Sequence, residues 1–290
     1  MRLTEWCVSA TLGHAPAFFK DSEALLTYAR YNIVSLAEQT QEKAPELTVV
    51  FRQYFNNTRE IFSLTIAGQK MYMITSPRDM AVVYKHAETL TFDGFIKDMY
   101  TQFGMSAAGI SKMFGQMASG DYQQHAHLGT GVQREQLHPG QNFDQLMGVY
   151  LRHIERQMDS TKLPDGCLVL DSGGEKVFQL RKWCASVLGS ASAEAFFGKA
   201  LLELDPNLLE DFHKFDCQSW KLLYQYPRMF AKPMFEAMER GTRTYTRYFQ
   251  LPIEERSDAC HYMKTVEVKQ RRAGMTDRDI AIAGQMFFWA

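Results

Sequence analysis

Cysteine has the widest chemistry of any residue in this sequence, because its thiolate can bind a metal, form a disulfide or act as a nucleophile. The 290 residues contain five cysteines that are far apart, without any Cys-x-x-Cys pair: Cys7, Cys167, Cys184, Cys217 and Cys260. We therefore expect neither a zinc site nor a disulfide framework, and no activated cysteine nucleophile. A reducing compartment fits this cysteine usage.

The other residues with catalytic potential also form no recognised motif. His125 and His127 are two apart, which on a helix points them to different sides, so we expect no metal site there. Residues 129–131 begin a glycine pattern that lacks the third glycine of a dinucleotide-binding loop. Glu236 and Glu239 could be paired acids on one helix face, although a solvated face is the simpler interpretation. Spacing alone therefore predicts no catalytic constellation.

Composition excludes several classes of partner. The formal net charge is −1, which gives no general attraction to nucleic acid or to an acidic membrane surface. No apolar run reaches the length of about 18 residues that a membrane span needs. We therefore predict no transmembrane segment and, for the sequence as given, a cytoplasmic location. The 20 Phe and 16 Met residues would fill either an ordinary core or a cavity for an apolar ligand.

The elements that must position these residues are mostly helical. Residues 61–74 alternate apolar and polar side chains around Gly68, which predicts a hairpin, and Ser76 and Pro77 then begin a helix. Apolar residues repeat at three- and four-residue steps in 143–158, 177–191 and 208–222, which predicts three helices. Pro227 and Pro233 mark a break before a fourth predicted helix, over about 234–249. Turn residues at 164–166 and 173–174 separate the first two of these four predicted helices. The sequence thus predicts a mainly α fold with a small early β sheet.

A further helix is predicted from Thr276 to Ala290. Thr276 is a suitable N-cap, and Asp279 lies three residues on, where a carboxylate can reach back to the cap. The residues that follow are apolar almost all round, which predicts a buried helix. Because no capping glycine, basic turn or proline precedes Ala290, we expect the chain to be a fragment.

Several segments occur in an order typical of one enzyme family. They are Gly13–Phe19, Phe62–Tyr84, Leu90–Phe95, Phe196–Gly198, Asp211–Asp216 with Trp220 and Pro227, Tyr248–Pro252 and Phe287–Ala290. Together they resemble the fungal cytochrome P-450 monooxygenases, in the branch related to sterol 7-hydroxylases and prostacyclin synthase. By this resemblance, residues 211–227 belong to the helices that roof the substrate cavity, and Phe287–Ala290 lie in the long helix that crosses the haem.

The resemblance also implies a cofactor, partners and site residues. The cofactor would be haem, the substrate a lipophilic metabolite of secondary metabolism, and the electron donor an NADPH-dependent reductase at the endoplasmic reticulum membrane. The haem-facing residues would include His127, Arg134 and Ala290. The substrate-facing residues would be Phe92, Phe95, Trp220, Tyr224 and Phe288, each of which could equally be ordinary core.

The sequence departs from the family pattern at several points. None of the five cysteines lies in the family's Phe-x-x-Gly-x-x-x-Cys-x-Gly haem loop, and we find no matching Glu-x-x-Arg pair. The residues that handle oxygen in the family would follow Ala290. Residues 33–53 look like an insertion. We therefore expect residues 1–290 to form a single incomplete P-450-like domain that is inactive as given, because oxygen activation depends on the thiolate ligand.

Two alternatives stay open. The first is a freestanding α-rich protein that binds an apolar ligand, and the second is an enzyme class that shows no recognised motif. A fragment should leave the face of residues 280–290 uncovered and aggregate when it is expressed alone. A complete binding protein should be monodisperse and melt cooperatively.

Overall fold

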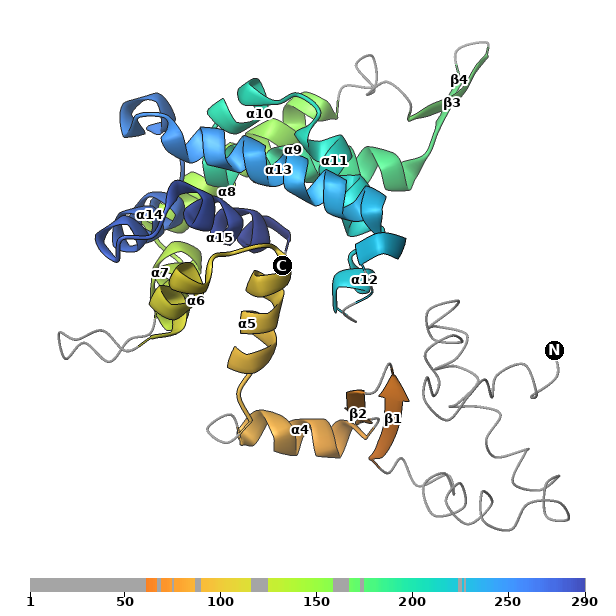
Figure 1. Cartoon of the computed structure of the whole chain (residues 1–290). Coiled ribbons are helices and arrows are strands. Elements are labelled where there is room, and N and C mark those ends of the chain that lie inside the picture. Colours follow the sequence, from red (N-terminus) through yellow and green to blue (C-terminus); the bar gives the residue numbers. More distant parts are fainter. Residues whose placement is uncertain are drawn as a thin grey trace, which may run out of the picture. The chain divides into compact units, whose positions relative to one another are not determined.

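The computed structural model describes residues 61–66, 69–74, 76–86, 90–115, 125–158, 167–172, 175–223, 226 and 228–289. The chain divides into two units, residues 1–91 and 92–290, and each is described by itself (Figure 1). The described residues include no helix that is both long and apolar enough to cross a membrane. The predicted insertion at 33–53 lies outside the described residues.

In the first unit, the described residues form a hairpin and a helix. Strands β1 (Phe62–Ile66) and β2 (Gln69–Met73) pair antiparallel along their full length. Helix α4 (Pro77–Lys85) follows, and its N-cap Ser76 accepts a hydrogen bond on Oγ from the backbone N–H of Asp79 at 3.4 Å. The predicted early hairpin and the predicted helix start are both confirmed.

The second unit consists of helices and one further hairpin. Its elements are α5 (Asp93–Gln102), α6 (Ala107–Phe114), α7 (His125–Leu137), α8 (Gln141–Gln157), β3 (Leu168–Ser172), β4 (Glu175–Phe178), α9 (Leu180–Phe197), α10 (Ala200–Leu204), α11 (Leu208–Asp216), α12 (Trp220–Leu223), η3 (Arg228–Phe230), α13 (Lys232–Gln250), η4 (Ile253–Arg256), α14 (His261–Arg272) and α15 (Asp277–Trp289). The described part of the chain is therefore mainly α, as predicted.

Helix α13 forms the centre of the second unit and packs against α11 and α15 (Figure 1). It confirms the helix predicted over 234–249, and its buried residues recur at helical spacing: Met234, Ala237, Met238, Gly241, Thr242, Thr244, Tyr245, Tyr248 and Phe249. Glycines allow the close approach of α15, since a Cβ on Gly284 would lie 2.9 Å from the ring of Phe249. The centre of the fold thus depends on two helix faces that fit without spare volume.

Buried polar groups between α13 and α15 are paired with one another. Thr242 donates through Oγ1 to Oε1 of Gln285 at 2.6 Å, and Gln285 donates through Nε2 to the carbonyl of Met238 at 3.0 Å. Both side chains are buried. Because an unpaired buried amide would be costly, this pairing fixes the register of the two helices.

Helix α15 begins at the cap that the sequence predicts, and its carboxylate also reaches another helix. Asp279 accepts on Oδ2 from Thr276 Oγ1 at 2.7 Å, and Thr276 Oγ1 accepts from the Asp279 backbone N–H at 3.1 Å. The same carboxylate accepts from the backbone N–H and the hydroxyl of Ser106, the N-cap of α6, at 2.8 and 2.9 Å. Asp279 thereby joins the starts of two helices that are 173 residues apart in the sequence.

Two of the predicted helices differ in the structure. Val177 lies in β4 rather than in a helix, because residues 168–178 pair as a second antiparallel hairpin. The predicted helix over 208–222 is broken into α11 and α12. Between them, the backbone N–H groups of Gln218 and Ser219 bond the carbonyls three residues earlier, at 3.0 and 3.1 Å, which tightens the chain into a turn.

Candidate functional site

An aromatic cluster surrounds the end of α15. The ring centroid of Trp289 lies 5.8 Å from that of Phe103 and 5.5 Å from that of Phe215. The ring of Phe288 meets that of Phe212 edge-on at 5.0 Å. Phe103 and Phe215 are fully buried, whereas Trp289 and Phe288 are half-buried. Residues from α11, α15 and the end of α5 thus form an apolar wall that a hydrophobic ligand could contact.

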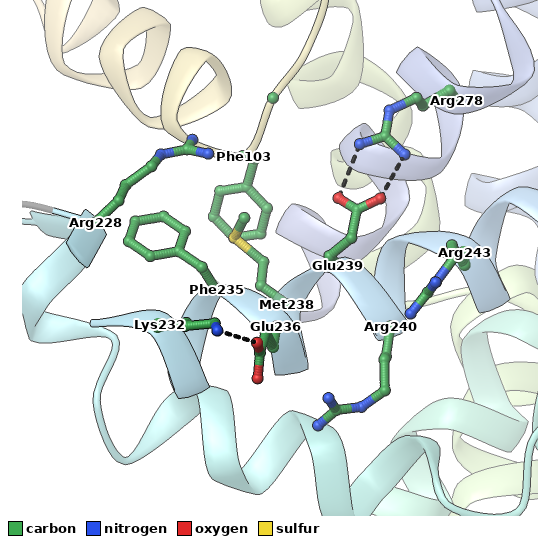
Figure 2. A pocket seen from close by; sticks show the side chains of 11 residues that line it. Phe103, Arg228, Lys232, Phe235, Glu236, Met238, Glu239, Arg240, Arg243 and Arg278 are labelled. Atoms are coloured by element: carbon green, nitrogen blue, oxygen red, sulfur yellow. Dashed lines mark hydrogen bonds and ion pairs between the residues drawn. The ribbon is translucent and has the colours of Figure 1, made fainter. Parts of the chain in front are cut away.

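A cavity of about 550 Å³ lies beside this cluster (Figure 2). Phe103 belongs to both, because its ring touches Phe215 and Trp289 and also lines the cavity. Phe235 and Met238 of α13 complete the apolar part of the lining. This volume is in the usual range for small-molecule sites, which is roughly 300–1,000 Å³.

The two carboxylates that line the cavity are both paired. Glu239 of α13 accepts a bidentate pair of hydrogen bonds from Arg278 of α15, at 3.0 and 2.9 Å (Figure 2). These hydrogen bonds hold the pKa of Glu239 below its ordinary value, against the opposing effect of burial. Glu236 lies 3.7 Å from the ammonium of Lys232. Both acids therefore already have a cationic partner.

The cations of the cavity outnumber its carboxylates. Arg240 turns toward α11, where it donates to both oxygens of Asp211 at 2.8 and 2.6 Å. Arg228 donates to the backbone carbonyl of Gln102 at 2.8 Å. Within the described residues, neither Arg228 nor Arg243 has a carboxylate in ion-pair contact. The cavity thus combines an aromatic wall with two guanidinium groups whose charge is not balanced by a direct partner.

Apart from the cavity, a polar cluster connects α8 to α9. His153 contacts Oε2 of Glu194 through Nδ1 at 2.6 Å and Oγ of Ser190 through Nε2 at 2.9 Å. Arg156 donates to the other oxygen of Glu194 at 2.8 Å. The hydrogen bonds from His153 and Arg156 outweigh burial and lower the pKa of Glu194. Serine, histidine and carboxylate in this order resemble the connectivity of a hydrolase triad.

The geometry around Ser190 argues against a nucleophile. Ser190 lies within α9 and its hydroxyl is 3.1 Å from the carbonyl of Val187, so its hydrogen already has an acceptor. Backbone N–H groups in a helix interior are bonded within the helix, so they cannot serve as oxyanion donors. We therefore interpret this cluster as a tie between two helices. Sequence analysis missed it because its members are separated by 37 and 41 residues.

Comparison with known proteins bears on the family of the chain. No protein-family model matches the chain. Over 219 residues, or 72% of its length, the chain is 27% identical to the cytochrome P450 monooxygenase poxD of Penicillium oxalicum. This similarity supports a relationship of the chain to the cytochrome P450 family. The match spans 41% of the length of that relative.

A P450 holds its haem iron through a cysteine thiolate, and the described residues do not fit that role. The described cysteines are Cys167, Cys184, Cys217 and Cys260, and none of them lines the cavity near Phe103 or a second cavity near Glu194. Burial raises the pKa of Cys260 to about 11, so this thiol is protonated at neutral pH. Cys217 Sγ lies 3.6 Å from His213 Nε2, but both residues are exposed. Cys7 lies outside the described residues.

The residues predicted to face a P450 substrate are not brought together. Phe288 belongs to the aromatic cluster, and Trp220 is half-buried with its ring centroid 6.1 Å from that of Tyr226. Phe92 and Phe95 are 70% and 45% exposed, and they contact each other edge-on. Tyr224 lies outside the described residues. Their role in substrate contact stays a prediction.

The residues predicted to face the haem also stay predictions. His127 lies in α7, but its side chain is outside the described part, as is Ala290. Arg134 is exposed on α7. Conversely, sequence analysis did not single out Phe103 or Arg243, because no motif marks either residue and only the tertiary fold brings them to one cavity.

Proposed function

We propose that the described residues form substrate-binding elements of a haem-dependent monooxygenase that hydroxylates a lipophilic metabolite. The observation that carries the proposal is the 27% identity with a fungal P450 monooxygenase over most of this chain. The aromatic cluster adds chemical support, because the half-buried Phe288 and Trp289 offer apolar edges to a hydrophobic ligand. Burial of such a ligand gains roughly 25 cal/mol per Å² of apolar surface.

In this proposal the described side chains bind and orient the substrate and exclude water. Haem, when bound, supplies the oxygen activation, and an NADPH-dependent reductase supplies electrons at the endoplasmic reticulum membrane. The axial cysteine belongs to residues other than those described. The branch related to sterol 7-hydroxylases and a place in secondary metabolism remain part of the proposal.

The proposal predicts that residues 1–290 alone do not hydroxylate. Among the described residues no cysteine thiolate lies at either cavity, and the thiolate is the ligand that favours O–O cleavage. The test is to mix the purified chain with haemin, reduce it and record the carbon monoxide difference spectrum. We expect no band of thiolate-ligated haem. Its appearance would show that one of the five cysteines does bind the iron.

Substrate binding by the aromatic cluster has a separate test. N-phenyl-1-naphthylamine is an uncharged apolar probe whose fluorescence rises in a hydrophobic site. Phe288→Ala should weaken its binding about tenfold, since a buried phenyl contact contributes ~1.5–3 kcal/mol. The matched control is Phe178→Ala, in β4 and 37% exposed, which should leave binding unchanged. Equal affinities for the two variants would remove the cluster from the proposal.

One observation favours the alternative of a freestanding binding protein. Residues 279–286 of α15 are buried, and Phe287, Phe288 and Trp289 are half-buried, so neighbouring helices cover this face. A chain that is monodisperse and unfolds in one cooperative transition, with probe binding intact, supports that alternative. Aggregation with an uncooperative transition supports the monooxygenase fragment.

A further inference from the structure

The cavity beside Phe103 has the chemistry of an anion site. Its two lining carboxylates are paired with Lys232 and Arg278. Within the described residues, the guanidiniums of Arg228 and Arg243 have no carboxylate in contact. Both are exposed, and both lower the pKa of Glu239 through their charge, so their field reaches the cavity interior. An anion that reached either guanidinium would meet a cation without displacing an existing ion pair.

The same cavity carries an apolar surface that an inorganic ion would not use. The guanidinium carbon of Arg228 lies 4.5 Å from the centroid of the Phe235 ring, so the cation contacts the apolar side of the cavity. Phe103 is also part of the lining, and its fully buried ring contacts Trp289 behind the cavity wall. Figure 2 shows Phe103, Phe235 and Met238 grouped together, with the charged residues around them. A ligand that satisfies both surfaces has an anionic group on an apolar body.

We propose that this cavity binds a lipophilic anion, with its charged group at Arg243 and its apolar body along Phe235. The site is a binding site in its own right and does not depend on haem chemistry. Arg243 is the residue most directly tested, because it makes no hydrogen bond or ion pair to another described side chain. Replacing it therefore removes a charge from the cavity and leaves the packing of α13 intact.

The test uses the whole chain and decanoate as the probe, with decanol as its uncharged counterpart, in isothermal titration at low and at physiological salt. Decanoate should bind at least tenfold more tightly than decanol, since a hydrogen bond to a charged group contributes ~1.5–3 kcal/mol. Arg243→Gln should weaken decanoate binding about tenfold and leave decanol binding unchanged. The matched control is Arg247→Gln, an exposed arginine one turn further along α13 that does not line the cavity.

A variant of opposite sign separates a specific site from a merely structural effect. Glu239→Gln removes a negative charge and frees Arg278, so it should tighten decanoate binding several-fold. Circular dichroism of every variant confirms that the fold is retained. The proposal is overturned if Arg243→Gln and Arg247→Gln weaken binding equally, if Glu239→Gln weakens it, or if decanol binds as tightly as decanoate.

The anion could come from a free acid or from a lipid headgroup, and a second arm distinguishes these sources. Vesicles of phosphatidylglycerol and of phosphatidylcholine are sedimented with wild-type chain and with Arg243→Gln. Sedimentation with phosphatidylglycerol that depends on Arg243 assigns the anion to a lipid headgroup. Decanoate binding without such sedimentation assigns it to a free lipophilic acid. Failure of both probes overturns the proposal.

Discussion

Asp279 joins the start of α15 to the start of α6, and its replacement by alanine tests whether this joint holds the second unit together. The carboxylate accepts hydrogen bonds from the backbone N–H and hydroxyl of Ser106 and from the hydroxyl of Thr276. Asp279 is 3% exposed, whereas Ser106 and Thr276 are open to water. Removal of the acceptor therefore leaves donors that water can reach and partly satisfy.

The expected loss can be worked from these contacts. A hydrogen bond to a charged group contributes about 1.5–3 kcal/mol, and water regains part of it at Ser106 and Thr276, so Asp279→Ala should cost about 3 kcal/mol. Asp279→Asn keeps the shape and one acceptor, and should cost about 1–2 kcal/mol. The assay is urea unfolding followed by far-ultraviolet circular dichroism. The control is Asp98→Ala, an exposed position on α5, which should change stability by less than about 0.5 kcal/mol.

The pH dependence gives this prediction a second readout. Burial raises the pKa of Asp279, but the hydrogen bonds from Ser106 and Thr276 outweigh it, and the net pKa lies below the ordinary value. Because the pKa of Asp279 is lower in the folded state, its ionised carboxylate stabilises the protein above the unfolded pKa of about 4. This contribution to stability is lost as the pH falls through the folded pKa. The gap between wild type and Asp279→Asn should therefore shrink below about pH 4. A gap that is absent at pH 7, or constant down to pH 2, would refute this account of the joint.

Three further replacements test the packing and the ion pairs. Glu267→Gln removes the carboxylate from the buried bidentate ion pair with Arg256, so the free energy of unfolding in urea should fall by about 3–5 kcal/mol. A loss of stability under about 1 kcal/mol would mean that the pair is not desolvated. Gly284→Ala places a methyl 2.9 Å from the ring of Phe249 and should lower stability by about 1–3 kcal/mol, and an unchanged unfolding midpoint would show that α13 and α15 are less closely packed. Glu194→Gln should cost about 1–3 kcal/mol at pH 7 and much less below pH 4, because the lowered pKa of Glu194 stabilises only above its unfolded value; a pH-independent loss would contradict this.

Sequence patterns predicted the elements whose signal is local. The helix over 234–249 was predictable because Pro227 and Pro233 mark a break before it. The caps at Ser76 and Thr276 were predictable because a short side chain there meets a nearby N–H. The hairpin over 168–178 was missed, because a run of four apolar residues, Cys167 to Leu170, fits a strand or a helix equally well.

The candidate sites depend on contacts that no local pattern carries. Ser106 and Asp279 are 173 residues apart, and the cavity combines side chains of α13 and α15 with Phe103 and Arg228 from other segments. The cluster of His153 and Glu194 likewise forms only when α8 packs on α9. Sequence analysis could therefore predict the class of fold and an apolar ligand, whereas the location of the cationic cavity needed the structure.

The most direct test of the proposed function is the sequence of the transcript beyond codon 290. The proposal predicts an in-frame segment with a Phe-x-x-Gly-x-x-x-Cys-x-Gly loop, whose cysteine would supply the thiolate that the described residues lack. The full-length product, purified with haem, would then give the carbon monoxide difference band of a thiolate-ligated iron. A transcript and genomic locus without such a loop, together with a stable chain that binds apolar probes on its own, would contradict the monooxygenase account and favour a freestanding binding protein.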